Sequence, residues 1–257
     1  MLGSCSNAQP VVEDWGDLEL SGYELSFSEE FDGPLDVSNW GCNTKWIAHT
    51  PWAGDFGAAA FSEPRLGFPF TISDGILAIE ARRAEDGSWW SGLLASWDKC
   101  GSGAAAQYGY FESRLRVPKD PGFWPAFWLI GVVSEPHGTA EIDVFEHYTV
   151  NTGSFSTGFH KHPGSDGSPK ISDGLTYTIP NGTRLSDFHL YGVLIDEKEM
   201  VMYFDRKEIW RAPMPPEFRQ PMYPLIDLAV VANDISADTP DRAKMFVDYV
   251  RIYQKPW

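Results

Sequence analysis

Short runs of alternating apolar and polar residues, broken by glycine and proline, dominate this chain. Examples are residues 23–27, 76–81 and 200–204. Side chains along a β-strand point to opposite faces in turn, so these runs are typical of strands with one buried face. The 24 Gly and 19 Pro separate many such runs, and we find no long amphipathic helix. The sequence therefore predicts an all-β fold, a jelly-roll sandwich of two packed antiparallel sheets.

The segment 141–146, with the sequence Glu-Ile-Asp-Val-Phe-Glu, breaks this alternation. In a regular strand Glu141 and Asp143 share one face, whereas Glu146 falls on the opposite, apolar face. A buried carboxylate without a partner is costly. One extra residue, a β-bulge, returns Glu146 to the face of the other acids, and bulges are common beside active sites. We therefore predict three carboxylates in a row on one open face.

Three carboxylates at this spacing suit chemistry on a glycosidic bond. The Cα atoms of Glu141 and Glu146 are expected to lie roughly 13 Å apart. Their side chains can close that distance to about 5–5.5 Å, the carboxyl separation of retaining glycosidases. Asp143 cannot ionise fully beside Glu141, so we expect a shared proton and coupled titrations. The spacing alone also allows an exposed acidic edge or a cation site built of oxygens.

Motifs around these acids resemble a known family. The runs Tyr-Gly-Tyr-Phe-Glu-Ser-Arg at 108–114 and Gly-Phe-Trp-Pro-Ala-Phe-Trp-Leu at 122–129 precede the acidic segment. Together they resemble the bacterial laminarinase and agarase-type branch of glycoside hydrolase family 16, whose catalytic strand reads E-x-D-x-x-E. Weaker similarities follow in order from 28–34 to 246–253. The resemblance implies a catalytic domain at 19–257 with a polar tether at 1–18.

The function implied by this resemblance is retaining endo-hydrolysis of a β-1,3 or mixed β-1,3/1,4 glucan. Glu141 is then the nucleophile, Glu146 the acid and base, and Asp143 the residue that orients Glu141. Laminarinases commonly carry an arginine after an early Ser-Gly pair, but here Ser91-Gly92 leads into two leucines. A decorated bacterial exopolysaccharide or a galactan is therefore an alternative substrate. A transglycosylase and a non-catalytic, lectin-like glycan-binding module are the alternative classes.

Aromatic residues are candidates for binding sugar rings, because flat apolar surfaces suit carbohydrate C–H faces. The chain has 11 Trp, and Trp124 and Trp128 share one face of their predicted strand. The resemblance implies that both line the subsites around the scissile bond. Trp46 and Trp52 are further candidates. A core position is the alternative for each tryptophan.

His160 and His162 alternate along the strand after the acids, so both can face one side. Two histidines alone make a poor zinc site. The resemblance implies instead that His160, or else His162, hydrogen-bonds the substrate. His147 is expected to be a satisfied neighbour of Glu146 or a rim residue.

Asp248 stands on an otherwise apolar strand face and needs a partner. The resemblance implies a structural calcium ion held by Asp248 together with backbone carbonyls near Glu30 and Gly75. A salt bridge from Asp248 to a nearby arginine or lysine is the alternative. No cofactor is expected for catalysis.

The net charge of −16 argues against a nucleic-acid partner, because phosphate binding needs a basic surface. It favours a neutral polysaccharide. No apolar stretch is long enough to span a membrane. Residues 2–5, Leu-Gly-Ser-Cys, resemble the end of a lipoprotein signal without its apolar stretch. We expect a monomer that is secreted, periplasmic or lipid-anchored through Cys5, with Cys42 and Cys100 able to pair.

Overall fold

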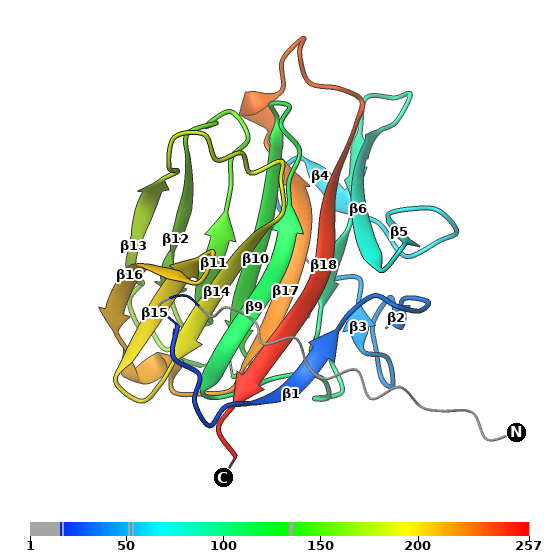
Figure 1. The fold of residues 1–257 in the computed structure, drawn as a ribbon. Coiled ribbons are helices and arrows are strands. Elements are labelled where there is room, and N and C mark those ends of the chain that lie inside the picture. The colour runs from blue at the N-terminus through cyan, green and yellow to red at the C-terminus, as the bar shows by residue number, and fades with distance from the viewer. Residues whose placement is uncertain (1–15, 17, 51, 53, 134–135, 257) are drawn as a thin grey trace, which may run out of the picture.

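The computed structural model describes residues 16, 18–50, 52, 54–133 and 136–256. Two β-sheets pack face to face, so the predicted sandwich is confirmed (Figure 1). Within the described ranges, the only helical elements are the 3₁₀ turns η1 (Pro216–Phe218) and η2 (Ala232–Asp234). No helix in those ranges has the length and apolar character needed to cross a membrane.

The first sheet has ten strands among the described residues. β9 and β18 lie at its centre and pair with each other, while the last strand also pairs with the first one (Figure 1). Its members are β1 (Glu24–Glu29), β4 (Ala59–Phe61), β5 (Phe70–Ser73), β6 (Ile76–Arg83), β7 (Trp89–Ser91), β9 (Gly109–Arg116), β14 (His189–Ile195), β15 (Glu199–Phe204), β16 (Lys207–Pro213) and β18 (Arg242–Gln254).

The second sheet has eight strands among the described residues and carries the predicted acids. Pairing is antiparallel except between β2 and β3, and between β4 and β7 of the first sheet, two parallel pairs that the alternation did not predict. Its members are β2 (Val37–Ser38), β3 (Trp46–Ile47), β8 (Leu93–Ala95), β10 (Phe123–Gly131), β11 (Ala140–Glu146), β12 (Ser154–Lys161), β13 (Ile171–Thr178) and β17 (Met222–Val230).

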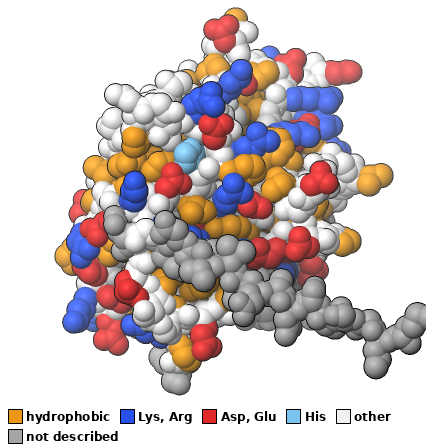
Figure 2. Space-filling view, viewed as in Figure 1, with side chains coloured by type: hydrophobic (Ala, Val, Ile, Leu, Met, Phe, Trp, Pro, Cys, Tyr) orange, Lys and Arg blue, Asp and Glu red, His pale blue; other side chains and the backbone are white. Residues whose placement is uncertain are grey.

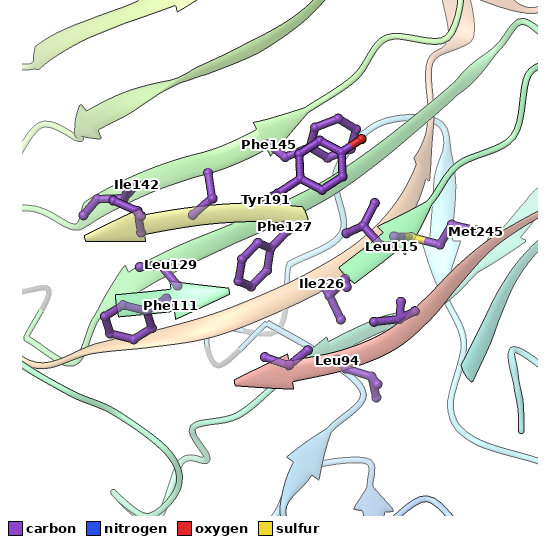
Figure 3. Close-up of a cluster of buried hydrophobic side chains, with 14 of the residues drawn as sticks. Leu94, Phe111, Leu115, Phe127, Leu129, Ile142, Phe145, Tyr191, Ile226 and Met245 are labelled. Carbon is purple, nitrogen blue, oxygen red and sulfur yellow. The ribbon is translucent and has the colours of Figure 1, made fainter. Parts of the chain in front are cut away.

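One hydrophobic core fills the space between the sheets. Phe111 from β9 and Tyr191 from β14 meet Phe127 from β10, Phe145 from β11 and Ile226 from β17 (Figure 3). All five are fully buried, and burying a side chain of this size contributes about 1.5–3 kcal/mol. This core fixes which face of β10, β11 and β17 points outward, and so aims the acids at solvent.

Leu18 already belongs to the packed structure. This side chain is buried on the outer face of the first sheet, against Tyr110, Val201 and Tyr203. Residues 1–15 and 17 of the expected tether lie outside the described residues, and so does Cys5.

A disulfide joins Cys42, in the loop after β2, to Cys100, in the loop after β8. The carboxylate of Asp98 accepts hydrogen bonds from the backbone N–H groups of both cysteines and of Ser102. Burial alone raises the pKa of Asp98, but these hydrogen bonds outweigh it and lower the pKa. The anion therefore holds the two loops together alongside the disulfide.

Replacing Cys42 and Cys100 by serine is expected to lower the free energy of unfolding by about 4 kcal/mol. The bond closes a loop with a sequence separation of 58, which restricts the unfolded chain. Urea denaturation with and without dithiothreitol provides the measurement. Dithiothreitol should lower the stability of the wild type to that of the double variant and leave the double variant unchanged. Equal unfolding free energies of the wild type and the double variant in the absence of dithiothreitol contradict this prediction.

Candidate active site

The predicted bulge is present in β11. From Asp143 to Glu146 this strand advances three residues, while its partner β12 advances only two, from Gly158 to Ser156. The pairing with β10 shifts in the same interval. The two intervening side chains are buried in the core. The extra residue therefore returns Glu146 to the face of the other two acids, as the sequence predicted.

The three acids line a cavity of about 480 Å³ on the outer face of the second sheet. Trp124 and Trp128 of β10 contribute to the same cavity. Asp143 and Glu146 also line a second, adjacent hollow of about 380 Å³. The reacting groups therefore lie between two hollows, an arrangement that accommodates sugar units on both sides of a bond.

Glu146 is the acid that can hold a proton near neutral pH. Burial, and secondarily the charge of Glu141, raises the pKa of Glu146 to about 7. The indole Nε1 of Trp124 donates a hydrogen bond to Oε1 of Glu146 at 3.1 Å and partly opposes this shift. A carboxyl group with this pKa can both give and take a proton at physiological pH.

Asp143 is 4% exposed and is more deeply buried than Glu141 and Glu146. Burial, followed by the charges of Glu141, Glu146 and Asp227, raises its pKa well above the ordinary value. Its Oδ2 is buried and has no hydrogen-bond partner among the described residues. Asp143 therefore holds its proton more tightly than an exposed aspartic acid does, and its protonated form can donate a hydrogen bond to a neighbouring carboxylate.

Asp227 is a further, fully buried carboxyl group in the cavity, which Asp55 also lines, and the sequence analysis did not identify it. It is fully buried on β17, opposite Ala126 of β10, which pairs in turn with Glu146. Trp128 donates its indole N–H to Oδ1 of Asp227 at 2.8 Å. Burial raises the pKa of Asp227 well above its usual value. The available signal was a single acid within the apolar run 222–230.

His160 in β12 and His162 just after it both contact the acids. Nε2 of His162 lies 3.2 Å from Oε2 of Glu141, and this hydrogen bond raises the pKa of His162. Nε2 of His160 lies 3.4 Å from Oδ2 of Asp143. Burial lowers the pKa of His160, so its ring is neutral near pH 7. His160 lines the smaller hollow and His162 the larger one, so both stay candidates for binding substrate.

His147 belongs to the structure around the site. Its side chain is buried, and Nδ1 lies 3.0 Å from the carbonyl oxygen of Ser154. Burial lowers the pKa of His147 to about 4. It is the satisfied neighbour of Glu146 that the sequence analysis described.

Aromatic rings surround the larger cavity. Trp52 is 52% exposed and meets Trp128 edge to face, with ring centroids 6.3 Å apart. Phe56 packs edge to face on both Trp124 and Trp128. Tyr148 stacks on Trp124, with ring centroids 5.1 Å apart. Three of the four predicted tryptophans therefore line the larger cavity together with Phe56, while Tyr148 lines the smaller hollow. Phe56 and Tyr148 lie in loops, which strand alternation does not describe.

The expectation for Trp46 is wrong. Only 1% of this residue is exposed, because it packs into the core against Phe27. Its indole N–H donates to Oε2 of Glu29 at 3.2 Å, which satisfies its polar atom. Trp46 is therefore a structural residue.

Arginines pair with the carboxylates of Asp248 and Glu30, whereas the carbonyl oxygens suggested for calcium belong to the backbone near Glu30 and Gly75. Arg114 donates a hydrogen bond to the carboxylate of Asp248. Arg251 binds Glu30 with two hydrogen bonds of 2.9 Å. A Cβ on Gly75 would lie 4.0 Å from the carbonyl oxygen of Glu30, so these two backbones are neighbours as expected. Asp248, the one carboxylate suggested as a calcium ligand, is therefore engaged in the salt bridge that the sequence left open as the alternative.

Comparisons with known proteins agree with this geometry. The sequence profile of Glycosyl hydrolases family 16 matches residues 89–251. Two proteins of Rhizobium meliloti (strain 1021), "Endo-1,3-1,4-beta-glycanase ExsH" and "Endo-1,3-1,4-beta-glycanase EglC", are 32% and 31% identical to this chain. Each alignment covers 92% of this chain and 53% of the relative, so the chain spans about half the length of these relatives.

A solved structure shows the same fold. The catalytic domain of an endo-1,3-beta-glucanase (laminarinase) from Thermotoga petrophila RKU-1 superposes with a TM-score of 0.72 at 23% identity. The match covers 91% of this chain and 99% of that domain. The profile match extends from β7 into β18 and includes the acidic strand β11. The chain is therefore a member of glycosyl hydrolase family 16.

Proposed function

We propose that this domain is a retaining endo-β-glycanase that hydrolyses internal β-1,3 or mixed β-1,3/1,4 linkages of a glucan. The observation that carries the proposal is the position of Asp143 and Glu146 between two hollows. An enzyme that cuts within a chain must hold sugar units on both sides of the bond. The names of the two Rhizobium meliloti relatives support the linkage type.

In the first step of the proposed reaction, the Glu141 carboxylate attacks the anomeric carbon and the glycosidic C–O bond breaks. Glu146 transfers its proton to the departing oxygen, which leaves as a hydroxyl group on the shortened chain. The product on the enzyme is a glycosyl ester of Glu141. The raised pKa of Glu146 supports this role, because the proton is present near pH 7.

In the second step, Glu146 is ionised and takes a proton from water. The water oxygen attacks the anomeric carbon, the ester bond breaks, and Glu141 is released as a carboxylate. Asp143 donates a hydrogen bond that orients the carboxylate of Glu141. This hydrogen bond stabilises Glu141 as it changes from a carboxylate to an ester and back. His162, which contacts Oε2 of Glu141, holds the other side of the same carboxylate.

A polysaccharide panel tests the proposed activity. We expect new reducing ends and discrete oligosaccharides from laminarin, curdlan or mixed-linkage β-glucan, and none from agarose or carrageenan. Proton NMR during the first minutes should show β-anomeric products, because a double displacement retains configuration. Initial α-anomeric products contradict the retaining mechanism. Cleavage confined to a succinoglycan-type exopolysaccharide contradicts the substrate assignment and leaves the mechanism intact.

We propose that the fold does not require calcium, because Arg114 already pairs with Asp248, the one carboxylate suggested as a ligand. The melting temperature should change by less than about 2 °C between excess EGTA and millimolar calcium, since no binding energy is linked to folding. The melting temperature of Arg114→Gln, in which Asp248 loses its arginine partner, is measured under the same two conditions for comparison. A rise of several degrees when calcium is added to the wild type contradicts this prediction.

We propose that the protein acts outside the cytoplasm, because its polymeric substrate lies there. We also propose that it acts as a monomer. The disulfide between Cys42 and Cys100 supports this location, since such bonds persist in oxidising compartments. Lipidation at Cys5 remains part of the proposal, and mass spectrometry of the protein from its native host tests it.

A further inference from the structure

A basic hollow lies on the outer face of the first sheet, away from the acids. Its volume is about 460 Å³, and Arg116, Lys119, Arg242 and Lys244 line it where β9 ends and β18 begins. Figure 2 shows Lys and Arg side chains gathered over the upper part of this face. The chain as a whole carries a net charge of −16, so this local excess of cations runs against the composition.

Arg116 is held in a fixed position without an anionic partner. Its guanidinium carbon lies 4.2 Å from the ring centroid of Phe246 and 5.2 Å from that of Phe188. Its Nε is buried and has no hydrogen-bond partner among the described residues. The neighbouring Arg114, in contrast, is paired with Asp248. The rings of Phe188 and Phe246 therefore orient the guanidinium of Arg116, whose Nε donates no hydrogen bond to another described residue.

One of the two acidic residues that line the hollow, Glu80, already pairs with cations. Glu80 of β6 accepts a 2.7 Å hydrogen bond from Nε of Arg82 and lies 3.4 Å from Nζ of Lys244. Glu80 is buried, and both Arg82 and Lys244 pair with it. The hollow therefore presents a positive surface, although Asp120 also contributes to its wall.

An exposed indole extends the same face. Trp90 of β7 is 42% exposed, while its neighbour Trp89 is buried in the core. Trp90 lies opposite Arg82, and Arg82 lies opposite Arg242, so the three form one row across β7, β6 and β18. A flat apolar ring beside cations matches a sugar ring that carries an acidic group.

We propose that this outer basic surface, defined by Trp90, Arg116, Lys119, Arg242 and Lys244, binds polysaccharide chains that carry carboxylate groups. The planar guanidinium of Arg116 is suited to bind a carboxylate through two hydrogen bonds. Lys119, Arg242 and Lys244 add charge around it, and Trp90 stacks on a sugar ring. The surface lies on the opposite side of the sandwich from the cavity, so a chain bound there leaves the acids free.

Binding of carboxymethylated laminarin tests this surface. Every protein carries Glu141→Gln, which keeps the polymer uncut, and excess neutral laminarihexaose occupies the active-site cavity. Arg116→Gln, Arg242→Gln and Lys244→Gln are measured singly and combined by isothermal titration calorimetry at low salt. The triple variant should bind about tenfold or more weakly, because charge-assisted hydrogen bonds are lost. Arg116→Lys should also weaken binding, since it keeps the charge and loses the planar fork.

Lys207→Gln is the matched control, because Lys207 begins β16 at the far edge of the same sheet and is exposed. Its affinity should stay within about twofold of the parent, the effect of a remote surface charge. If Lys207→Gln loses as much affinity as Lys244→Gln, binding depends on net charge and the proposal is overturned. The proposal is also overturned if the parent binds unmodified laminarin as tightly as carboxymethylated laminarin. Tighter binding to phosphatidylglycerol vesicles than to the carboxymethylated polymer assigns the surface to a membrane instead and likewise overturns the proposal.

Discussion

Replacement of Glu141 by alanine is expected to reduce the hydrolysis of β-glucan by a factor on the order of 10⁵, the range seen when a catalytic nucleophile is removed. Without this carboxylate the covalent glycosyl intermediate cannot form. The shortened side chain also leaves room beside the anomeric carbon, so a small external nucleophile can enter. Sodium azide should therefore restore turnover and give a glycosyl azide of α configuration, opposite to that of the substrate.

Two controls accompany this experiment. Glu63→Ala removes an exposed carboxylate in the loop after β4 and should leave the rate unchanged. Near-ultraviolet circular dichroism of Glu141→Ala should match the wild type, because Trp124 and Trp128 keep their packing. A β-glycosyl azide from the rescued variant means that a single displacement from the opposite face did not occur, and it removes Glu141 from the nucleophile's role.

The catalytic strand was predictable because parity along a strand is a strong constraint. Three acids can share one face only if a residue is inserted between Asp143 and Glu146, and the observed bulge supplies it. The hydrophobic core gives the same result, since Val144 and Phe145, the residues between these two acids, are buried in it. Where burial and charge together dictate a conformation, sequence alone is sufficient.

The aromatic residues were less predictable, because a tryptophan is stable in a core and in a sugar-binding cavity. Trp46 and Trp52 differ in exposure by half of their surface, yet the sequence around each gives no signal of that difference. Phe56 and Tyr148 lie in loops, whose path depends on contacts with distant strands. Asp227 was the recoverable omission, because one acid in an otherwise apolar buried strand needs an explanation.

The salt bridges show a second limit. Sequence pattern placed Asp248 on its strand and identified either a cation or an arginine as its partner. The choice depended on Arg114, which is distant in sequence and adjacent only after β9 pairs with β18. Identifying a partner of this kind requires knowledge of strand order, which periodicity does not contain.

Glu146→Gln is expected to slow the hydrolysis of β-glucan by about 10²–10⁴-fold, the usual contribution of general acid–base catalysis. The wild-type kcat/KM should fall as pH rises above about 7, because Glu146 then loses the proton it must donate. The variant should lack this ionisation. A 2,4-dinitrophenyl β-laminaribioside, whose leaving group needs no proton, should still form the glycosyl enzyme and show a burst. Azide should then accelerate turnover and give a β-glycosyl azide.

The same substitution should stabilise the fold at alkaline pH. Folding raises the pKa of Glu146 from 4.5 to about 7, so the folded state binds the proton more tightly than the unfolded chain. The stability that this proton supplies is complete below pH 4.5 and is lost as pH rises through about 7, a difference of about 3 kcal/mol. Glutamine does not ionise, so the difference in unfolding free energy between variant and wild type should move in favour of the variant between pH 4 and pH 8. A difference that stays constant over this interval, measured by urea denaturation, means that Glu146 ionises equally in both states and cannot hold the catalytic proton at neutral pH.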